Sequence, residues 1–392
     1  MSNTPLAPTT DFYGVFANVD GRDLEFWQTA EKFGREEVLP VIDEYWEKAE
    51  YPLPLVGRLA ELGLLIDGVD IEGVEHQSPL ATGLVEMEIS RYDGSVATAL
   101  AVQMGLAART IANLGSQEQK DKYLVAMHKG EIRGSFGLTE PEHGSDSIAL
   151  ETSAKKVDGG WILNGEKRWI GQGSVGHITN IFARMENGQV GGFIVPQDAE
   201  GYHAETIVGK MALRAIPQAH ITLTDCFVPD ENQLPGCQSF RDVAKVLMAT
   251  RVSVAWSALG QAITCYEVAR EHAFNRVQFG EPLINRQMIQ QRLANMLIEV
   301  TQMMLLCREL AAKQEAGTLT EQEASLAKVN NTRKARAIAA DARDLLGGNG
   351  ILLENRVGRH FADIETLHTY EGTDTMQSLI IGKKISGVGA YK

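Results

Sequence analysis

The sequence predicts a mainly α-helical protein with a β domain in its middle. Apolar side chains recur at helical spacing from about residue 21 to 130 and again from about residue 239 onward. Between these regions the period shortens, and Gly, Thr and β-branched residues become more frequent. At 392 residues the chain is also too long for one ordinary domain. We therefore expect a helical domain over residues 1–130, a β domain over 131–235 and a helical bundle over 236–392.

The N-terminal region carries amphipathic helix patterns. In residues 23–49 the apolar side chains fall close to one stripe with charged residues opposite, and the pattern is broken once, at Pro40. Later segments repeat the pattern over residues 54–65, 79–94, 96–115 and 116–130. In the last of these, Ser116 is expected to cap the helix, with Gln119 at the capping-box position.

The middle region reads as short strands. The stretch GWILNGEKRWI, residues 160–170, contains Asn164-Gly165 between two apolar runs, which predicts a hairpin turn at that dipeptide. Further strands are expected at residues 178–185, 191–196 and 220–229.

Helical patterns return in the last third of the chain and are long. Three segments of at least 28 residues have few helix breakers, and they span residues 242–274, 285–317 and 319–348. Such lengths are typical of a helical bundle.

Composition excludes several classes of protein. A net charge of −14 argues against a nucleic-acid or anionic-membrane partner, because both would be repelled. The four cysteines lack CxxC spacing, which argues against a zinc site or a disulfide framework and favours a reducing compartment. No signal-like N-terminus, no apolar run long enough for a membrane span and no peroxisomal ending is evident, so we expect a cytoplasmic protein. His360, Asp363 and His368 are more typical of a polar helix face than of a metal site.

Four motifs in order give the chain a family resemblance. They are GSFGLTEPEHGSDS (134–147), RVQFGEPL (276–283), LLGGNG (345–350) and YEGT (370–373). Together they resemble the acyl-CoA dehydrogenase family over nearly the whole chain. KRWIG, LPG after the β domain and the last sixteen residues resemble most the branch that holds glutaryl-CoA dehydrogenases and plant short-chain acyl-CoA oxidases. The resemblance implies a helical N-terminal domain, a β-barrel-like middle domain and a C-terminal four-helix bundle.

The resemblance places a catalytic base at Glu371. Such enzymes remove the α-proton of an acyl thioester and pass the β-hydrogen as hydride to flavin N5, which gives the 2-enoyl product. A carboxylate suits the first step, because an apolar pocket raises its pKa towards that of the activated α-carbon. Gly372 would let the thioester approach the backbone, and the Glu371 N–H would help to hold its carbonyl oxygen. Taken alone, YEGT is more typical of a solvated glutamate at a helix start, and the other motifs favour the base.

The resemblance also implies an FAD site. Exposed backbone N–H groups in the glycine-containing turns of residues 134–147 can meet the flavin and its pyrophosphate. In the family, an arginine and a phenylalanine of RVQFG contact an FAD bound mainly by a neighbouring subunit, so the site would be complete only in a dimer or tetramer. The residues implied are Phe136, Gly137, Leu138, Thr139, Ser145, Trp169, Ile170, Gly171, Arg276, Phe279, Gln287, Asp344, Leu345, Leu346, Gly347, Gly348, Thr373 and Thr375. The LGGNG stretch is also expected to end a helix, with Gly at the position after the C-cap.

Two positions depart from the family pattern. Where KxWIT usually places a threonine near flavin N5, this chain has Gly171, so a hydroxyl is missing, and we expect an altered redox potential or oxygen reactivity. Where glutaryl-CoA dehydrogenases carry an arginine over the acyl pocket, the alignment gives Ala97, next to Thr98. The nearest cation, Arg91, lies roughly 120° away around an ideal helix.

The departure at Ala97 favours a short- or medium-chain monocarboxylic acyl-CoA, because a dicarboxylic substrate would bury an unpaired charge. Substrate contacts implied by resemblance are Ser145, Arg251 and Gly372, together with Ala97 and Thr98; Arg251 is equally typical of an arginine paired inside a bundle. The expected electron acceptor is an electron-transfer flavoprotein. The alternatives are an acyl-CoA oxidase that uses O2, a decarboxylating glutaryl-CoA dehydrogenase and, more remotely, a non-catalytic acyl-CoA-binding protein that would lack flavin.

Overall fold

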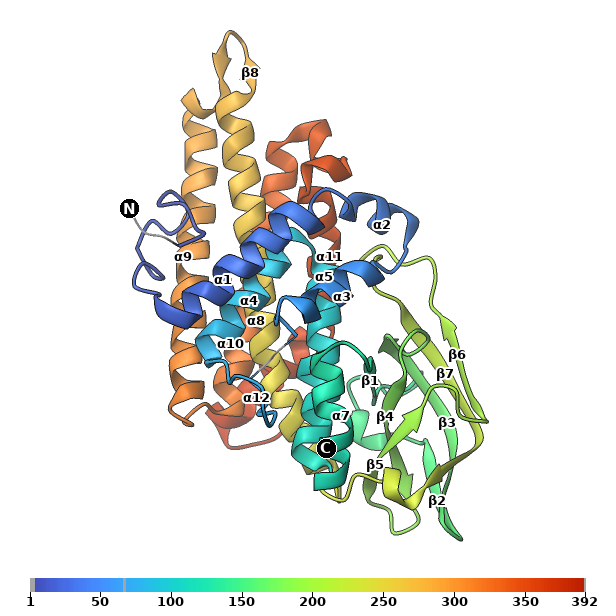
Figure 1. Cartoon of the computed structure of the whole chain (residues 1–392). Coiled ribbons are helices and arrows are strands. Elements are labelled where there is room, and N and C mark those ends of the chain that lie inside the picture. The colour runs from blue at the N-terminus through green and yellow to red at the C-terminus, as the bar shows by residue number, and fades with distance from the viewer. Residues whose placement is uncertain (1–3, 66–67, 391–392) are drawn as a thin grey trace.

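A computed structural model describes residues 4–65 and 68–390, and in it two helical regions flank a sheet. Figure 1 shows the N-terminal helices in blue and cyan packed against the long C-terminal helices, with the sheet at one side of both. The predicted fold class, with its helical ends and β-rich middle, is confirmed.

The N-terminal helices bury their apolar stripes against each other and against α8. They are α1 Gly21–Phe33, η1 Gly34–Val38, α2 Ile42–Lys48, α3 Leu53–Glu61, α4 Pro79–Tyr92, α5 Gly94–Leu100, η2 Ala101–Ala108, α6 Arg109–Leu114 and α7 Gln117–His128. Asp93 separates α4 from α5, because its backbone is extended and its side chain accepts the N–H groups of Ser95 and Val96. The capping box of Ser116 and Gln119 is present as predicted.

The middle region forms one curled seven-stranded sheet. The strands are β1 Gly134–Gly137, β2 Ser153–Val157, β3 Gly160–Gly171, β4 Ile178–Met185, β5 Val190–Pro196, β6 Tyr202–Thr206 and β7 Gln218–Pro229. They are ordered β1-β4-β2-β3-β7-β6, and β5 pairs with the other side of β4. Short helices η3 (Ser147–Ala149) and η4 (Asp230–Asn232) lie in its connections.

The hairpin predicted at Asn164-Gly165 is wrong. Strand β3 runs through both residues, and the β2–β3 turn lies at Asp158-Gly159, where Gly159 has a φ of 75°. The Asn-Gly pair instead marks a bulge against β7, and the Asn164 side chain bonds the backbone N–H of Asp225 at 2.8 Å and its carboxylate at 3.1 Å. Both dipeptides have hairpin chemistry, and the pairing with β7 decides between them.

The C-terminal region is a bundle around α8 (Phe240–Asn275). Its other elements are the β8–β9 hairpin (Val277–Gln278, Glu281–Pro282), η5 Leu283–Asn285, α9 Gln287–Glu315, α10 Glu321–Leu345, η6 Gly347–Ile351, η7 Leu353–Asn355, α11 Val357–Thr369 and α12 Asp374–Ser386. Helix α10 has 25 residues and is shorter than the segment predicted over residues 319–348, because its C-cap is Leu346 and Gly347 follows with a φ of 60°.

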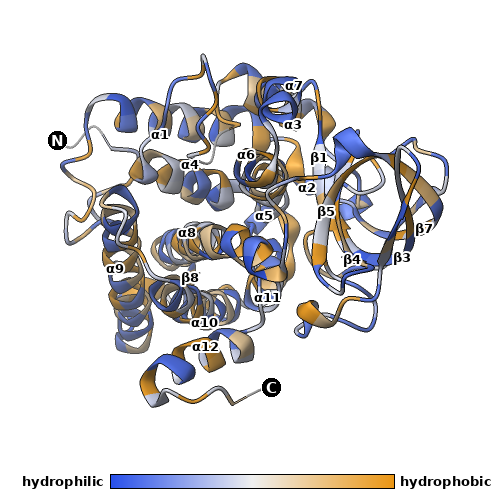
Figure 2. Ribbon diagram, turned by 90° about the horizontal axis from the view of Figure 1, so that it is seen from below, coloured by the Kyte–Doolittle hydropathy of each residue, from blue (hydrophilic) through white to orange (hydrophobic). Residues whose placement is uncertain are grey.

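Helix α8 is the central element of the helical part. It packs against α10, α4, α9 and α11, and Figure 2 shows it enclosed by these helices with the sheet apart from it. In the described part of the chain, two helical stretches could cross a membrane by length and composition, Gly94–Leu114 and Phe240–Asn275, but 83% and 78% of their most apolar windows are buried inside the protein. Both therefore have the burial of core helices.

Candidate functional site

Glu371 lies in the short loop between α11 and α12, and its carboxylate faces α8. The Thr250 hydroxyl of α8 donates to Glu371 Oε2 at 2.5 Å. Burial raises the pKa of this carboxyl, while the Thr250 hydrogen bond and the charges of Lys328 and Arg251 oppose that rise. A carboxylate that is still ionisable but more basic than in water is the kind of group that can take a proton from carbon.

The alternative of a solvated helix-start glutamate does not describe this residue. Helix α12 begins three residues later, and its N-cap is Thr373, whose hydroxyl accepts the N–H of Met376. Glu371 itself has a φ of 54° and Gly372 one of 82°, so two consecutive residues are left-handed. Within the described residues no group accepts a hydrogen bond from the Glu371 N–H, which leaves this donor available to a ligand.

Sequence reasoning missed two residues that hold this loop. The Lys328 ammonium donates to the carbonyls of Tyr370 and Gly372, and Gln377 Nε2 donates to the Glu371 carbonyl at 2.7 Å. Lys328 and Gln377 are both essentially fully buried. A signal for Lys328 exists in the sequence, because it falls on the stripe of α10 that carries Ala324 and Ala335, where a lysine is out of place.

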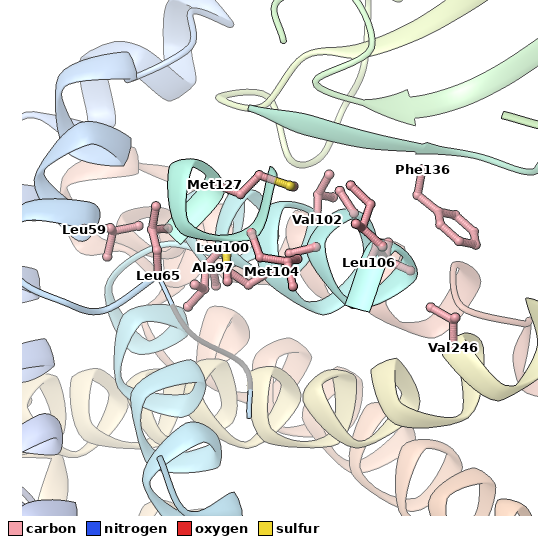
Figure 3. Close-up of a cluster of buried hydrophobic side chains, with 14 of the residues drawn as sticks. Leu59, Leu65, Ala97, Leu100, Val102, Met104, Leu106, Met127, Phe136 and Val246 are labelled. Atoms are coloured by element: carbon pink, nitrogen blue, oxygen red, sulfur yellow. The ribbon is translucent and has the colours of Figure 1, made fainter. Parts of the chain in front are cut away.

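The wall beside the base is formed from α5 and the Tyr370 ring. Burial raises the pKa of Tyr370, and a hydrogen bond with Thr98 lowers it. Ala97 lies in the buried apolar cluster with Leu100 and Val102, so no cation occupies that position. Figure 3 shows these three residues together on one helical segment, and Phe136 next to Val246 at the end of the cluster.

The predicted flavin loop and the base meet on α8. Phe136, at the end of β1, belongs to the same cluster as Val246, and Thr250 follows Val246 by one helical turn. That separation is about 6 Å of helix rise. The loop after Phe136 is fixed by Glu140, whose carboxylate accepts the N–H of Thr152 at 2.9 Å.

Backbone donors in this loop suit a planar polar ligand. The Arg168 N–H bonds the Thr139 carbonyl at 2.8 Å and so joins the loop to β3, whereas the Thr139 N–H has no acceptor among the described residues. Trp169 has a φ of 65° and its side chain is 54% exposed, although Ile170 beside it is buried. A free N–H and an exposed indole side by side fit the pyrimidine edge and the face of a flavin ring. Ser145 lies exposed further along the same loop.

Gly171 has no room for a larger residue. A Cβ placed there would lie 2.9 Å from Val102 Cγ2, closer than real Cβ contacts. The methyl groups of Val102 therefore occupy part of the volume that a threonine would need.

Arg251 is paired inside the bundle. Its guanidinium donates to Glu321 at 2.8 Å, and its charge also acts on Glu371. Arg91 lies on α4, across the break at Asp93, and is bound by Glu88 and Glu267, each at 2.6 Å. Both cations are therefore already paired with carboxylates of this chain.

Another group of predicted residues lies far from the base. Arg276 and Phe279 lie at the β8–β9 hairpin, at the end of α8 opposite the sheet in Figure 1, and Phe279 is 96% exposed with a φ of 52°. The 26 residues of helix from Thr250 to Arg276 correspond to about 39 Å. The other predicted contacts lie at the start of α9 and at the end of α10. Among them, the exposed residues are Gln287, Asp344, Gly347 and Gly348, and the buried ones are Leu345 and Leu346. The chain alone does not bring these residues to Glu371. Thr375, by contrast, lies exposed in the first turn of α12.

Comparison with known proteins matches all three parts of the chain. The family models that match are the N-terminal domain of acyl-CoA dehydrogenase over residues 22–131, its middle domain over 135–226 and its C-terminal domain over 240–386. The short-chain specific acyl-CoA dehydrogenase of rat mitochondria is 31% identical over 364 residues, which cover 90% of this chain and 87% of that one.

Solved structures match over the same extent. A glutaryl-CoA dehydrogenase from Mycobacterium smegmatis is 38% identical, with a TM-score of 0.95 over 98% of this chain and 99% of that one. A second glutaryl-CoA dehydrogenase structure from the same organism, in complex with FADH2, is 32% identical, with a TM-score of 0.95 over 99% of this chain and 100% of that one.

Proposed function

Because the chain belongs to the acyl-CoA dehydrogenase family, we propose that it oxidises a short- or medium-chain acyl-CoA to the 2-enoyl-CoA with Glu371 as the base. The family consists of flavin-dependent oxidoreductases that act on CH–CH bonds. The observation that carries the proposal is the partly buried Glu371 carboxylate, with a raised pKa and an unpaired backbone N–H beside it.

FAD is the cofactor. The structural relative with FADH2 supports it, and the free Thr139 N–H and exposed Trp169 fit its ring. When bound, it accepts the β-hydrogen and its electron pair as hydride. Phe136, Leu138 and Gly171 would border it from this chain.

The residues of this chain supply the proton chemistry. Glu371 takes the α-proton onto its carboxylate, so its negative charge passes to the substrate as the α-carbon is deprotonated. The Glu371 N–H stabilises the charge that develops on the thioester oxygen; such a donor contributes roughly 10²–10³-fold. The partly buried Tyr370 ring and the buried Ala97 would exclude water from the reacting carbons.

The substrate is inferred from the charges around Ala97. A dicarboxylic acyl chain would place its far carboxylate where Arg91 and Arg251 are already paired. Glu86, which accepts the Ser257 hydroxyl, adds negative charge near Tyr370. Burying an unpaired carboxylate there costs several kcal/mol, on the order of a thousandfold in affinity. The short-chain relative from rat supports a monocarboxylic substrate.

Oxidative decarboxylation of glutaryl-CoA is the second candidate, since the structural relatives from Mycobacterium smegmatis are named glutaryl-CoA dehydrogenases. An electron-transfer flavoprotein as acceptor, a homo-oligomer that shares its FAD sites and a cytoplasmic location are further parts of the proposal, and use of O2 is the alternative to that acceptor.

An anaerobic titration of the purified yellow protein tests the proposal. Butyryl-CoA and glutaryl-CoA are added in parallel while flavin absorbance is followed, and air is then admitted. Bleaching by butyryl-CoA alone is expected, and slow return of colour in air would mark a dehydrogenase rather than an oxidase. Bleaching by glutaryl-CoA alone would overturn the substrate assignment. Bleaching by neither would overturn the proposed dehydrogenation of both monocarboxylic and dicarboxylic short-chain acyl-CoA.

A further inference from the structure

In the loop that carries Glu371, two buried side chains bind the carbonyls of the base and of the residues on either side of it. Lys328 of α10 binds the Tyr370 and Gly372 carbonyls, on either side of the base. Gln377 of α12 binds the Glu371 carbonyl at 2.7 Å and the Gly372 carbonyl at 3.1 Å. We call Lys328 and Gln377 the carbonyl clamp.

The clamp holds a conformation that the loop would not adopt alone. Glu371 has a Cβ and a φ of 54°, and left-handed backbone is unfavourable for such a residue unless its surroundings fix it. Gly372 follows with a φ of 82°, and a Cβ there would lie 2.3 Å from Gln377 Nε2. Glycine is therefore required for the clamp to close on its carbonyl.

The burial of Lys328 needs an explanation that packing does not give. Lys328 is 1% exposed in the buried stripe of α10, which consists mostly of small uncharged residues, and a lysine there has to be desolvated. The ammonium is bound only to loop carbonyls among the described residues, and not to a carboxylate. Its interactions are thus directed at the segment that presents the base.

We propose that Lys328, with Gln377, is a positioning residue for the base: it fixes the left-handed backbone of Glu371, so that the carboxylate and the free N–H both face the reacting thioester. The inference rests on the proposed function of Glu371. Lys328 would also have a second effect, because its positive charge favours the ionised form of Glu371.

The charges around Lys328 are consistent with that second effect. Burial lowers the pKa of Lys328 to about 7, and the charges of Glu371 and Asp374 oppose this while Arg251 adds to it. On α11, His368 also senses the Lys328 charge. Reciprocally, Lys328 lowers the pKa of Glu371, so removing the cation should raise that pKa further.

The test separates proton removal from flavin chemistry. Acetyl-CoA has α-hydrogens but no β-carbon, so its exchange of hydrogen for deuterium in D2O reports the base alone. Exchange is followed by mass spectrometry as a function of pH for the flavin-containing wild type, Lys328→Met, Lys328→Arg and Glu371→Gln. Lys334→Met is the matched control, because Lys334 lies on the same helix but pairs with Glu299.

Lys328→Met is expected to slow exchange about 100-fold, the effect of a small misplacement of a catalytic group. Its acid limb, where exchange falls as the pH is lowered, should move to higher pH. Lys328→Arg should keep the wild-type acid limb, and Lys334→Met should match the wild type. The proposal would be overturned if Lys328→Met exchanged at the wild-type rate with an unchanged acid limb. It would also be overturned if the variant had a lowered Tm but an unchanged exchange rate per folded molecule.

Gln377→Met keeps the proposal testable if Lys328→Met does not fold. It removes the uncharged half of the clamp, so exchange should slow without a shift of the acid limb, and wild-type exchange would count against the clamp. A wild type that exchanges no faster than Glu371→Gln would instead refute the base assignment itself, a result that the Lys328 variants cannot produce.

Discussion

Single residues decide the chemistry proposed for this protein, and Glu371 is the first of them. Glu371→Gln keeps the shape of the side chain and removes its basicity, so the protein should remain yellow and bind butyryl-CoA. Its rate of flavin bleaching should fall at least 10²–10⁴-fold, the typical contribution of a positioned base. Stopped-flow absorbance under anaerobic conditions measures this. Bleaching at the wild-type rate would show that another group removes the proton.

The Thr250 hydroxyl tunes the same carboxylate. It donates to Glu371 and so lowers the pKa of the base, against the effect of burial. Thr250→Val removes this hydrogen bond at constant shape, and the pKa of Glu371 should rise.

Because only the ionised carboxylate accepts a proton, the acid limb of kcat/KM should then move to higher pH in Thr250→Val. At pH values on the acid limb of both proteins the loss should be about tenfold or more, given roughly 1.5–3 kcal/mol for a hydrogen bond to a charged group. The variant should recover at high pH, and a uniform loss at every pH would contradict this assignment. Thr332→Val is the control, since its hydroxyl bonds only helix carbonyls of α10.

Gly171 and Val102 are in contact range of each other, and the sequence alone indicates the importance of Gly171 but not that of Val102. The missing threonine is visible in KRWIG, but the methyl groups that replace it come from η2, nearly seventy positions earlier. Gly171→Thr should therefore lower stability by about 1–3 kcal/mol through overpacking. Val102→Ala added to it should restore the Tm.

The double variant then tests the role of the hydroxyl. Compared with Val102→Ala alone, it should change the flavin reduction potential or the rate of reoxidation by oxygen. Unchanged values of both would refute the link between Gly171 and flavin reactivity.

At the scale of elements, the sequence predicted helices and strands well where the apolar periodicity is strong. It predicted them less well where tertiary contacts determine the position of a turn or bulge. Asn164-Gly165 has hairpin chemistry, yet β7 pairs along β3 past it and makes it a bulge. The separate segments predicted over residues 79–94 and 96–115 agree with the break at Asp93. The sequence does not show what holds that break, because the buried Arg359, which binds the Asp93 carboxylate at 2.7 Å, comes from α11. The contacts of Lys328 with the Glu371 loop could not be predicted, because its partners are backbone carbonyls some forty residues away.

Asp363 joins three elements through one buried carboxyl. Its Oδ1 accepts the N–H of Leu213, in the loop before β7, at 2.6 Å and the Trp46 indole of α2 at 3.2 Å. Burial, with the charge of Asp93, raises its pKa to about 7. Since an unfolded aspartate titrates near pH 3.9, this carboxyl contributes full stability below about pH 4 and loses it as the pH rises towards 7.

Asp363→Asn keeps the acceptor and removes the titration. Relative to the wild type, the variant should gain about 3 kcal/mol in the free energy of unfolding between pH 5 and pH 7.5. Chemical denaturation of both proteins at the two pH values measures the difference. A difference that does not depend on pH would refute a raised pKa at this site.

At the scale of the whole molecule, the order of motifs predicted the family and the layout, because those motifs are short and local. The sequence could not place the parts of the site. Arg276 and Phe279 lie at the far end of α8, about 39 Å of helix from Thr250, and Phe279 is almost fully exposed there. Residues predicted for one FAD are thus divided between two ends of one protomer, as expected if each protomer completes the site of another.

Hybrid oligomers test this division directly. Glu371→Gln lacks the base and Arg276→Ala lacks the predicted phosphate contact, so each should be inactive as a homo-oligomer. When the two are co-expressed with different tags, a mixed pair contains one site with both an intact Glu371 and the Arg276 of the other subunit. With random pairing, half of the dimers are mixed and each has one working site, so about a quarter of wild-type activity should return. If both residues served the FAD of their own chain, every site would lack one of them and mixing would restore nothing.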